Sequence, residues 1–201
     1  MNAPELAAFH LSRRRAAALA LLLPCALARA QEATQGQQPA KPLDVPYVPT
    51  PMAVVNKMLD MARVRRGDVL YDLGCGDGRI VVTAAKERGA RGVGIDIDPR
   101  RIAEARRRAQ EAGVEDRVRF IEGNLFDADF AEADVVALYL LPRINLELRP
   151  QLWRQLKLGS RVVSHAFDMG EDWPPEQMQN LRGSTIYAWT IRKAQKDAVR
   201  T

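Results

Sequence analysis

Three glycines alternate with other residues between a short apolar segment and a helical segment, and this loop constrains the fold more than any other feature of the chain. The apolar segment, 69–73, contains Asp72, and the glycines are Gly74, Gly76 and Gly78. Glycine adopts positive φ values and lets a ligand approach the backbone closely. The helix after the loop would offer free N–H groups and a partial positive charge. This order predicts a ligand site at the carboxyl edge of an α/β sheet.

The rest of the chain alternates strand and helix signals. Helices are predicted at 52–62, 80–88, 99–112 and 144–156, and strands at 69–73, 92–96, 118–122, 134–140 and 161–165. Two last segments, 177–181 and 184–191, flank Arg182-Gly183 and are predicted as a hairpin. Because strand–helix repeats form parallel sheets with helices on both faces, we predict a doubly wound, mostly parallel α/β sheet that ends in an antiparallel hairpin.

The glycine spacing and the nearby acids indicate the kind of ligand. A dinucleotide site favours G-x-G-x-x-G, with the pyrophosphate on the helix dipole, whereas the spacing here is G-x-G-x-G. Asp72 and Asp77 flank the loop and would suit a ligand that carries an ammonium group and no phosphate. Asp96 ends the next predicted strand, where a carboxylate accepts hydrogen bonds from ribose hydroxyls. These positions predict a nucleoside ligand and disfavour a nicotinamide dehydrogenase.

Four other residues have both a functional and a structural interpretation. Asn124 and Leu125 follow the third predicted strand, where they would reach an adenine, but asparagine is also common in turns. His165 ends the fifth strand and would titrate in the range of a general base, although a buried structural histidine is the commoner case. Cys75 lies inside the glycine loop without a basic neighbour in sequence, so we interpret it as packing rather than as a nucleophile.

The first thirty residues have the pattern of an export leader. Arg13 to Arg15 precede an apolar run over 16–28 that is too short to span a bilayer, and Ala28-Arg29-Ala30 fits a signal-peptidase site. We expect a signal peptide or leader at 1–30, an extended linker at 31–50 and a folded domain at 51–201. The protein would be exported to the periplasm or tethered to a membrane by the leader, and cytoplasmic if the start is misassigned.

The net charge of +5 arises mostly in this leader. Residues 31–201 hold 26 basic and 24 acidic side chains, so their charge gives no case for a nucleic-acid partner. Two cysteines and two histidines exclude a disulfide framework and disfavour a multi-His metal site. We expect no metal, no nucleic acid and a monomer.

Several segments resemble one known family. D-L-G-C-G-D-G at 72–78 resembles the cofactor loop of the class I, seven-stranded, Rossmann-like methyltransferases that depend on S-adenosylmethionine. V-P-Y-V-P-T-P at 45–51, G-N-L-F at 123–126, L-Y-L-L-P at 138–142 and R-V-V-S-H-A-F at 161–167 are similar to the small protein-lysine methyltransferases that modify the adenine nucleotide translocase and the c-ring protein of ATP synthase. The resemblance implies S-adenosylmethionine as cofactor and a protein lysine as acceptor, with small membrane proteins among the candidate substrates.

The resemblance also implies roles for individual residues. The cofactor would be bound by Tyr47, Thr50, Asp72, Gly74, Cys75, Gly76, Gly78, Asp96, Ile97, Asn124 and Leu125. An acceptor lysine must lose its proton, and a dry wall at 138–142 would lower the pKa of its amine. Tyr139 is the candidate to orient that amine, and His165 is the candidate base. Methylation of a small molecule or of RNA, and an exported nucleoside-binding protein without turnover, remain as alternatives.

Overall fold

The computed structural model describes residues 47–199, so the predicted leader and all but the last four residues of the predicted linker lie outside the described residues. The described part contains one seven-stranded sheet in the order β3-β2-β1-β4-β5-β7-β6. Its strands are β1 (Val69–Leu73), β2 (Arg91–Asp96), β3 (Val118–Glu122), β4 (Val135–Leu138), β5 (Arg161–His165), β6 (Gln177–Leu181) and β7 (Ser184–Thr190). The first five strands are parallel, and β7 is antiparallel to β5 and β6. The predicted sheet with its C-terminal hairpin is confirmed.

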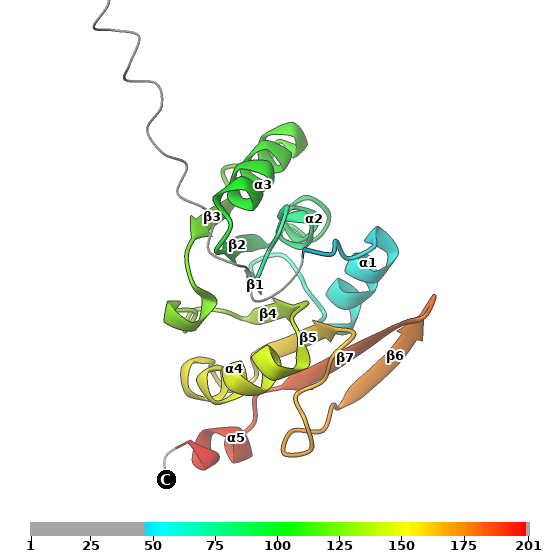
Figure 1. Ribbon diagram of the computed structural model, residues 1–201, viewed down its shortest axis with the longest axis vertical. Coiled ribbons are helices and arrows are strands. Elements are labelled where there is room, and N and C mark those ends of the chain that lie inside the picture. The colour runs from blue at the N-terminus through cyan, green and yellow to red at the C-terminus, as the bar shows by residue number, and fades with distance from the viewer. Residues whose placement is uncertain (1–46, 200–201) are drawn as a thin grey trace, which may run out of the picture. The chain divides into compact units, whose positions relative to one another are not determined.

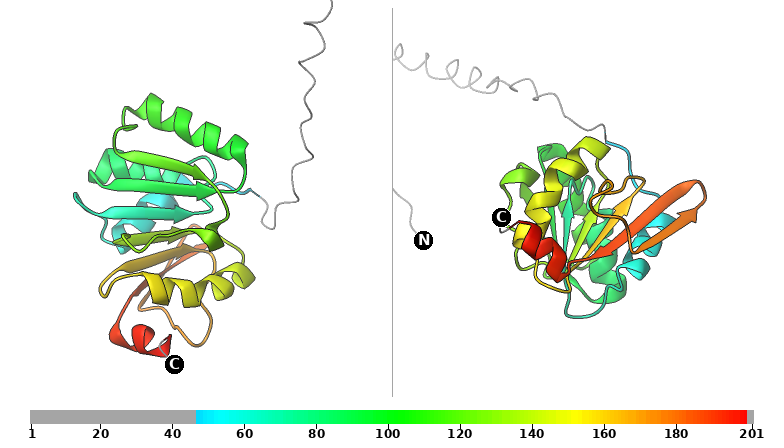
Figure 2. Two further views of the ribbon diagram at one scale, coloured as in Figure 1. Left: turned by 90° about the vertical axis from the view of Figure 1, so that its left-hand side faces the viewer. Right: turned by 90° about the horizontal axis from the view of Figure 1, so that it is seen from below.

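Two layers of helices cover the sheet (Figures 1 and 2). The helices are α1 (Met52–Met61), α2 (Arg79–Arg88), α3 (Pro99–Ala112), α4 (Pro142–Gln155) and α5 (Lys193–Ala198). One core cluster joins α1, α2 and α3 to one face, and a second joins α4 to the other. The doubly wound arrangement brings the carboxyl ends of β1 to β5 to one edge of the sheet, called here the carboxyl edge, and the amino ends to the opposite amino edge.

The structure differs from the sequence prediction mainly at the bounds of β4 and α4 and in one added helix. β4 ends at Leu138 rather than at residue 140, and α4 begins at Pro142, because proline is well suited to the first position of a helix. The short helix α5 was not predicted. The connection from β3 to β4 contains only the one-turn helix η1 (Leu125–Asp127), so no α-helix covers β1 to β3 on the α4 side (Figure 2, left). Within the described residues, no helix has the length and apolar character needed to cross a bilayer.

Candidate cofactor site and acceptor region

The glycine loop between β1 and α2 adopts a backbone that requires glycine. Gly74, Gly76 and Gly78 have φ values of +82°, +52° and +74°. The N–H groups of Gly74 and Cys75 donate to the carbonyl of Ile95 at 2.8 and 2.9 Å, which fixes the loop to β2. The predicted G-x-G-x-G turn therefore lies at the carboxyl edge, against the neighbouring strand.

Close packing at two of these glycines holds other elements against the loop. A Cβ atom on Gly78 would lie 2.7 Å from Ala105 and Phe120, so this glycine lets α3 and β3 approach. A Cβ atom on Gly76 would lie 2.6 Å from the ring of Tyr47. Arg101 stacks on that ring at 4.0 Å. The structure thus places Tyr47 over the loop, and its contact with a cofactor stays a prediction.

Asp77 does not act as expected from the sequence. Its carboxylate forms ion pairs with Arg79 at 2.6 Å and with Arg108 at 2.5 Å. Burial would raise the pKa of Asp77, but hydrogen bonds and charge from Arg79 and the charge of Arg108 outweigh it and hold that pKa below its usual value. The prediction that two free carboxylates face the ligand is therefore corrected, because Asp77 is already neutralised by arginines and orders the start of α2.

Asp72 is the carboxylate that remains available for a cationic group of the ligand. It is buried, and its side chain has no hydrogen-bond partner among residues 47–199. Burial first, and then the charges of Asp96 and Asp77, raise the pKa of Asp72 to about 8. A buried carboxylate with no protein cation beside it suits a cationic ligand group, because such a group would restore its usual ionisation.

Asp96 organises the other side of the loop. One carboxylate oxygen accepts from the N–H of Gly76 at 2.8 Å, and the other accepts from the N–H of Asp98 at 2.9 Å. The side chain stays partly exposed, and each oxygen has a second lone pair for a ribose hydroxyl. The next residue, Ile97, is 49% exposed, which is high for isoleucine and leaves an apolar surface for an adenine ring.

The structure gives Asn124 a turn role. Its Oδ1 atom accepts from the N–H of Phe126 at 3.1 Å and caps η1, which leaves that oxygen one lone pair, so a contact of Asn124 with an adenine amine stays a prediction. Leu125 is partly buried beside it. Cys75 is buried, and burial together with nearby carboxylates raises the pKa of its thiol far above the usual value. That environment disfavours the thiolate and agrees with a packing role.

The two residues predicted to act on the acceptor amine, Tyr139 and His165, lie together. The ring of Tyr139, just after β4, is 4.0 Å from the ring of His165 at the end of β5. The Nδ1 atom of His165 lies 3.3 Å from the hydroxyl of Thr50, whose carbonyl accepts from Arg79. His165 is only 3% exposed, and this burial lowers the pKa of its ring, so the imidazole is neutral at neutral pH. Thr50 thus connects the glycine-loop region to the Tyr139–His165 pair.

Asn145 lies near the Tyr139–His165 pair, and the sequence did not predict a role for it. It is fully buried on α4, and its Nδ2 atom donates to the carbonyls of Phe167 and Asp168 at 3.2 Å. Those carbonyls belong to a tight turn in which the N–H of Phe167 donates to the carbonyl of His165 at 2.9 Å and Ala166 has a φ of +68°. A non-glycine residue in that region is strained and is held only by its surroundings. Asn145 is therefore a positioning residue for the turn that carries His165.

The comparisons with known proteins agree with this geometry. Residues 72–177 match the model of the ANTKMT methyltransferase domain. The chain belongs to this family. A protein-lysine N-methyltransferase from Saccharolobus islandicus is 43% identical over 152 residues, which are 73% of this chain and 94% of the archaeal protein. The human lysine N-methyltransferase named for the c-ring protein of ATP synthase is 32% identical over 145 residues, 72% of this chain and 61% of that protein.

A solved structure gives the cofactor. It is described as an RNA methyltransferase from Salinibacter ruber in complex with S-adenosylhomocysteine. It is 57% identical to this chain, has a TM-score of 0.71, and the match covers 73% of this chain and 95% of that one. The chain is an S-adenosylmethionine-dependent methyltransferase. The site fits that cofactor, since Asp72 would meet its cationic end, Asp96 its ribose and Ile97 its adenine.

The raised pKa of Asp72 predicts how cofactor binding depends on pH. A cationic ligand favours the ionised carboxylate, whereas the free site is mostly protonated below about pH 8. The affinity for S-adenosylmethionine should therefore rise by up to about tenfold per unit between about pH 6 and 7. In Asp72→Asn the affinity should be weaker and lose this dependence, while Asp127→Asn, an acid in η1 after β3, should behave like the parent. Calorimetric titration across this range checks it, and a flat profile in the parent would contradict the role of Asp72.

The role of Asn145 predicts a change at His165. Asn145→Ala should release the strained turn, let water reach the imidazole and raise the pKa of His165 toward its usual value. The loss of the hydrogen bonds should also lower the free energy of unfolding by about 1–3 kcal/mol. NMR titration of the full chain carrying His10→Gln isolates the one imidazole. Asn180→Ala, which removes a side-chain bond from the β6–β7 turn, is the matched control and should leave the pKa of His165 unchanged.

Proposed function

We propose that the protein transfers the methyl group of S-adenosylmethionine to a lysine side chain of a protein. The observation that carries this proposal is the match to protein-lysine methyltransferases, above all to the archaeal protein, which the match covers almost from end to end. The family model supports it, and so do the relatives named for lysines of the ATP synthase c-ring protein and of the adenine nucleotide translocase.

Methyl transfer requires the protein mainly to orient the acceptor amine and to exclude water from it. A sulfonium methyl group is already activated, so transfer needs an amine in line with it at about 3 Å. That amine must be neutral, although the usual pKa of lysine is about 10.4. An apolar wall disfavours the ammonium form and lowers this pKa. Leu138 and Leu140 are buried at the end of β4, and they supply such a wall.

We assign different tasks to the two aromatic residues. Tyr139 is partly exposed, so we propose that its hydroxyl contacts the acceptor amine. His165 is buried behind it and neutral, with Nδ1 beside the hydroxyl of Thr50. Burial makes this imidazole a weak proton acceptor, so we propose that the lysine amine loses its proton to solvent as it enters the apolar surroundings. We propose that His165 holds the Tyr139 ring by stacking.

RNA is the second candidate acceptor, and the description of the Salinibacter ruber structure favours it. The distribution of charge disfavours RNA as the acceptor. The segments at the amino edge are 60–68, 86–91, 115–119, 131–134, 154–161 and 192–197, and the rest of the described chain, which includes the carboxyl edge, holds 10 basic and 14 acidic side chains. This remainder has no excess of cations for a phosphate backbone. A lysine acceptor needs no such cations, because its amine reacts in the neutral form.

A methyl-transfer assay separates the two acceptors. The full chain is incubated with S-adenosylmethionine carrying a labelled methyl group and with protein and RNA fractions, each treated with protease or nuclease as a control. Label should appear in protein and map to lysine by mass spectrometry. Tyr139→Phe should lower kcat by about tenfold or more with unchanged cofactor affinity, and Tyr187→Phe on β7 should not. Label confined to RNA would overturn the proposal.

We propose further that residues 1–30 direct export or tether the protein to a membrane. The basic cluster at 13–15 and the apolar run at 16–28 support this. Cell fractionation followed by N-terminal sequencing should give a periplasmic chain that starts at Gln31, or a membrane-bound chain with the leader intact. A chain in the cytoplasm that starts inside the leader would contradict the proposal.

A further inference from the structure

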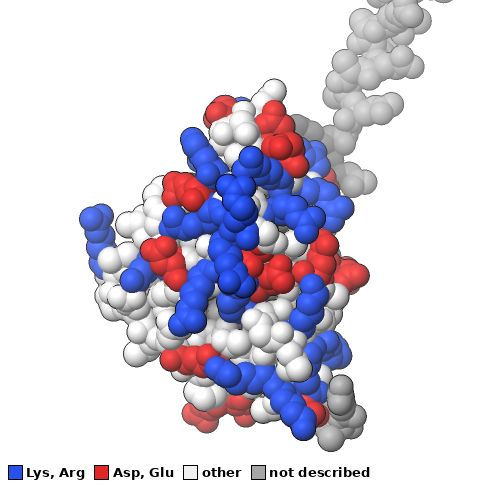
Figure 3. Space-filling view, turned by 180° about the vertical axis from the view of Figure 1, so that it is seen from behind, with Lys and Arg blue, Asp and Glu red and all other residues white. Residues whose placement is uncertain are grey.

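The charges of the domain are separated between the two edges of the sheet. The amino-edge segments are 60–68, 86–91, 115–119, 131–134, 154–161 and 192–197. Together they hold 14 lysines and arginines against 8 acids, whereas the rest of the described chain has an excess of acids. Figure 3 shows the band of lysine and arginine side chains that results on the side facing away from the viewer in Figure 1.

Several cations of this band lack a counter-charge. Arg66, Arg91 and Arg119 are exposed and form no ion pair with any described residue. The arginines of α3 differ, because most of them pair with acids: Arg100 with Asp98, Arg101 with Glu104, Arg107 with Glu111 and Arg108 with Asp77. The amino edge, and not α3, is therefore the surface with positive charge available for a partner.

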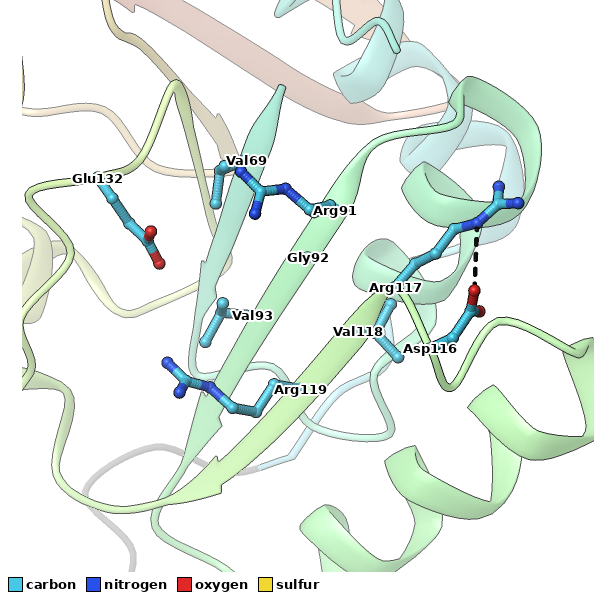
Figure 4. Close-up of a pocket in the computed structure, with 9 residues that line it drawn as sticks. All are labelled: Val69, Arg91, Gly92, Val93, Asp116, Arg117, Val118, Arg119 and Glu132. Atoms are coloured by element: carbon cyan, nitrogen blue, oxygen red, sulfur yellow. Dashed lines mark ion pairs between the residues drawn. The ribbon is translucent and has the colours of Figure 1, made fainter. Parts of the chain in front are cut away.

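The connection between β3 and β4 contains no α-helix, and this leaves more of the amino edge open to solvent. It leaves a hollow of about 240 Å³ beside the amino ends of β1, β2 and β3. Arg91 and Arg119 extend over it from neighbouring strands, with Val69 and Val93 at its floor and Glu132 across from them (Figure 4). Guanidinium groups bind phosphate oxygens through paired N–H donors, so Arg91 and Arg119 have the chemistry to contact the phosphate of a lipid headgroup.

An exposed apolar residue stands within the same edge. Leu158 is 63% exposed in the turn between α4 and β5, with Lys157 and Arg161 beside it in sequence. Leucine at a loop tip between cations has the character of a side chain that enters the interfacial layer of a bilayer while its neighbours meet the headgroups. From the cation band, the hollow and Leu158 together, we propose that the amino edge docks on a membrane surface rich in anionic lipid.

The surface fits a bilayer better than it fits a nucleic acid. Proteins that hold single strands stack bases on exposed aromatic rings. Among the described residues the large exposed apolar side chains are Tyr47, Val48, Met52, Ile97, Leu146, Leu158 and Met178, and the one aromatic, Tyr47, lies at the carboxyl edge. The cations instead follow the amino ends of neighbouring strands, which are about 4.8 Å apart, and so form a broad and shallow face.

Docking at this edge has a consequence for the acceptor. A five-residue strand is about 17 Å long, so the carboxyl edge would open toward solvent at about that distance from the headgroups or farther. A docked enzyme would reach a lysine on a segment that projects from the membrane or on a soluble protein near it, and not one inside the bilayer.

Vesicle sedimentation with the full chain tests the proposal without any methyl acceptor. Vesicles of phosphatidylcholine with about one third phosphatidylglycerol are compared with phosphatidylcholine alone at about 0.1 M salt. The triple variant Arg66→Gln, Arg91→Gln, Arg119→Gln should bind anionic vesicles at least about tenfold more weakly than the parent. Leu158→Ser should weaken binding by about fivefold. Because every variant keeps the leader, any binding through the leader is the same in all of them.

The matched control removes the same charge from the carboxyl edge. Arg100→Gln, Arg143→Gln and Arg182→Gln together should leave vesicle binding within about twofold of the parent, since these exposed positions lie away from the amino edge. Equal loss in both triple variants would show a response to net charge alone and would overturn the proposal. It would also be overturned if the parent bound a labelled RNA through Arg66, Arg91 and Arg119 and showed no preference for anionic vesicles.

Discussion

The carboxylate of Asp96 joins segments that lie 20 residues apart in the chain, and the cofactor site depends on this junction. One oxygen holds the N–H of Gly76 in the loop after β1, and the other holds the N–H of Asp98 at the start of α3. Both donors would otherwise be unpaired at a partly buried edge, which is costly. The loop, the strand and the helix are therefore fixed before any cofactor arrives, and Tyr47 has a defined surface to pack on.

Burial controls the electrostatics of the carboxyl edge. It raises the pKa of Asp72 and lowers that of His165, so both groups favour their neutral forms in the free protein. A cationic cofactor reverses the effect at Asp72, whereas the buried Leu138, Leu140 and His165 suit a neutral amine. The same edge thus attracts a charged donor and disfavours a charged acceptor. Asn145, on α4, holds the strained turn that follows His165, so the buried position of His165 depends on the packing of α4.

The sequence predicted most of the fold because its signals are local. β1, β3, β5 and β6 have the predicted bounds, and the loop glycines have the positive φ values that their pattern indicated. Prediction was weaker where a side chain had a choice of partners. Asp77 pairs with Arg108, 31 residues away, so its carboxylate is not free as the sequence suggested, and Asn124 uses one lone pair of its Oδ1 atom to cap its own turn. Asn145 carried no local signal, because its partners lie more than 20 residues further along the chain.

The sequence by itself determined the order of strands and helices, the conformation of the glycine loop and the cofactor class, since each depends on residues close together in the chain. Only the tertiary structure decided that Asp72 stays unpaired, that His165 is buried and that the positive charge lies at the amino edge. These properties depend on burial and on distances between segments that meet only when the sheet forms. The parallel strands sort chain segments to two opposite edges, and this sorting separates a cofactor edge with buried acids from an amino edge with exposed arginines.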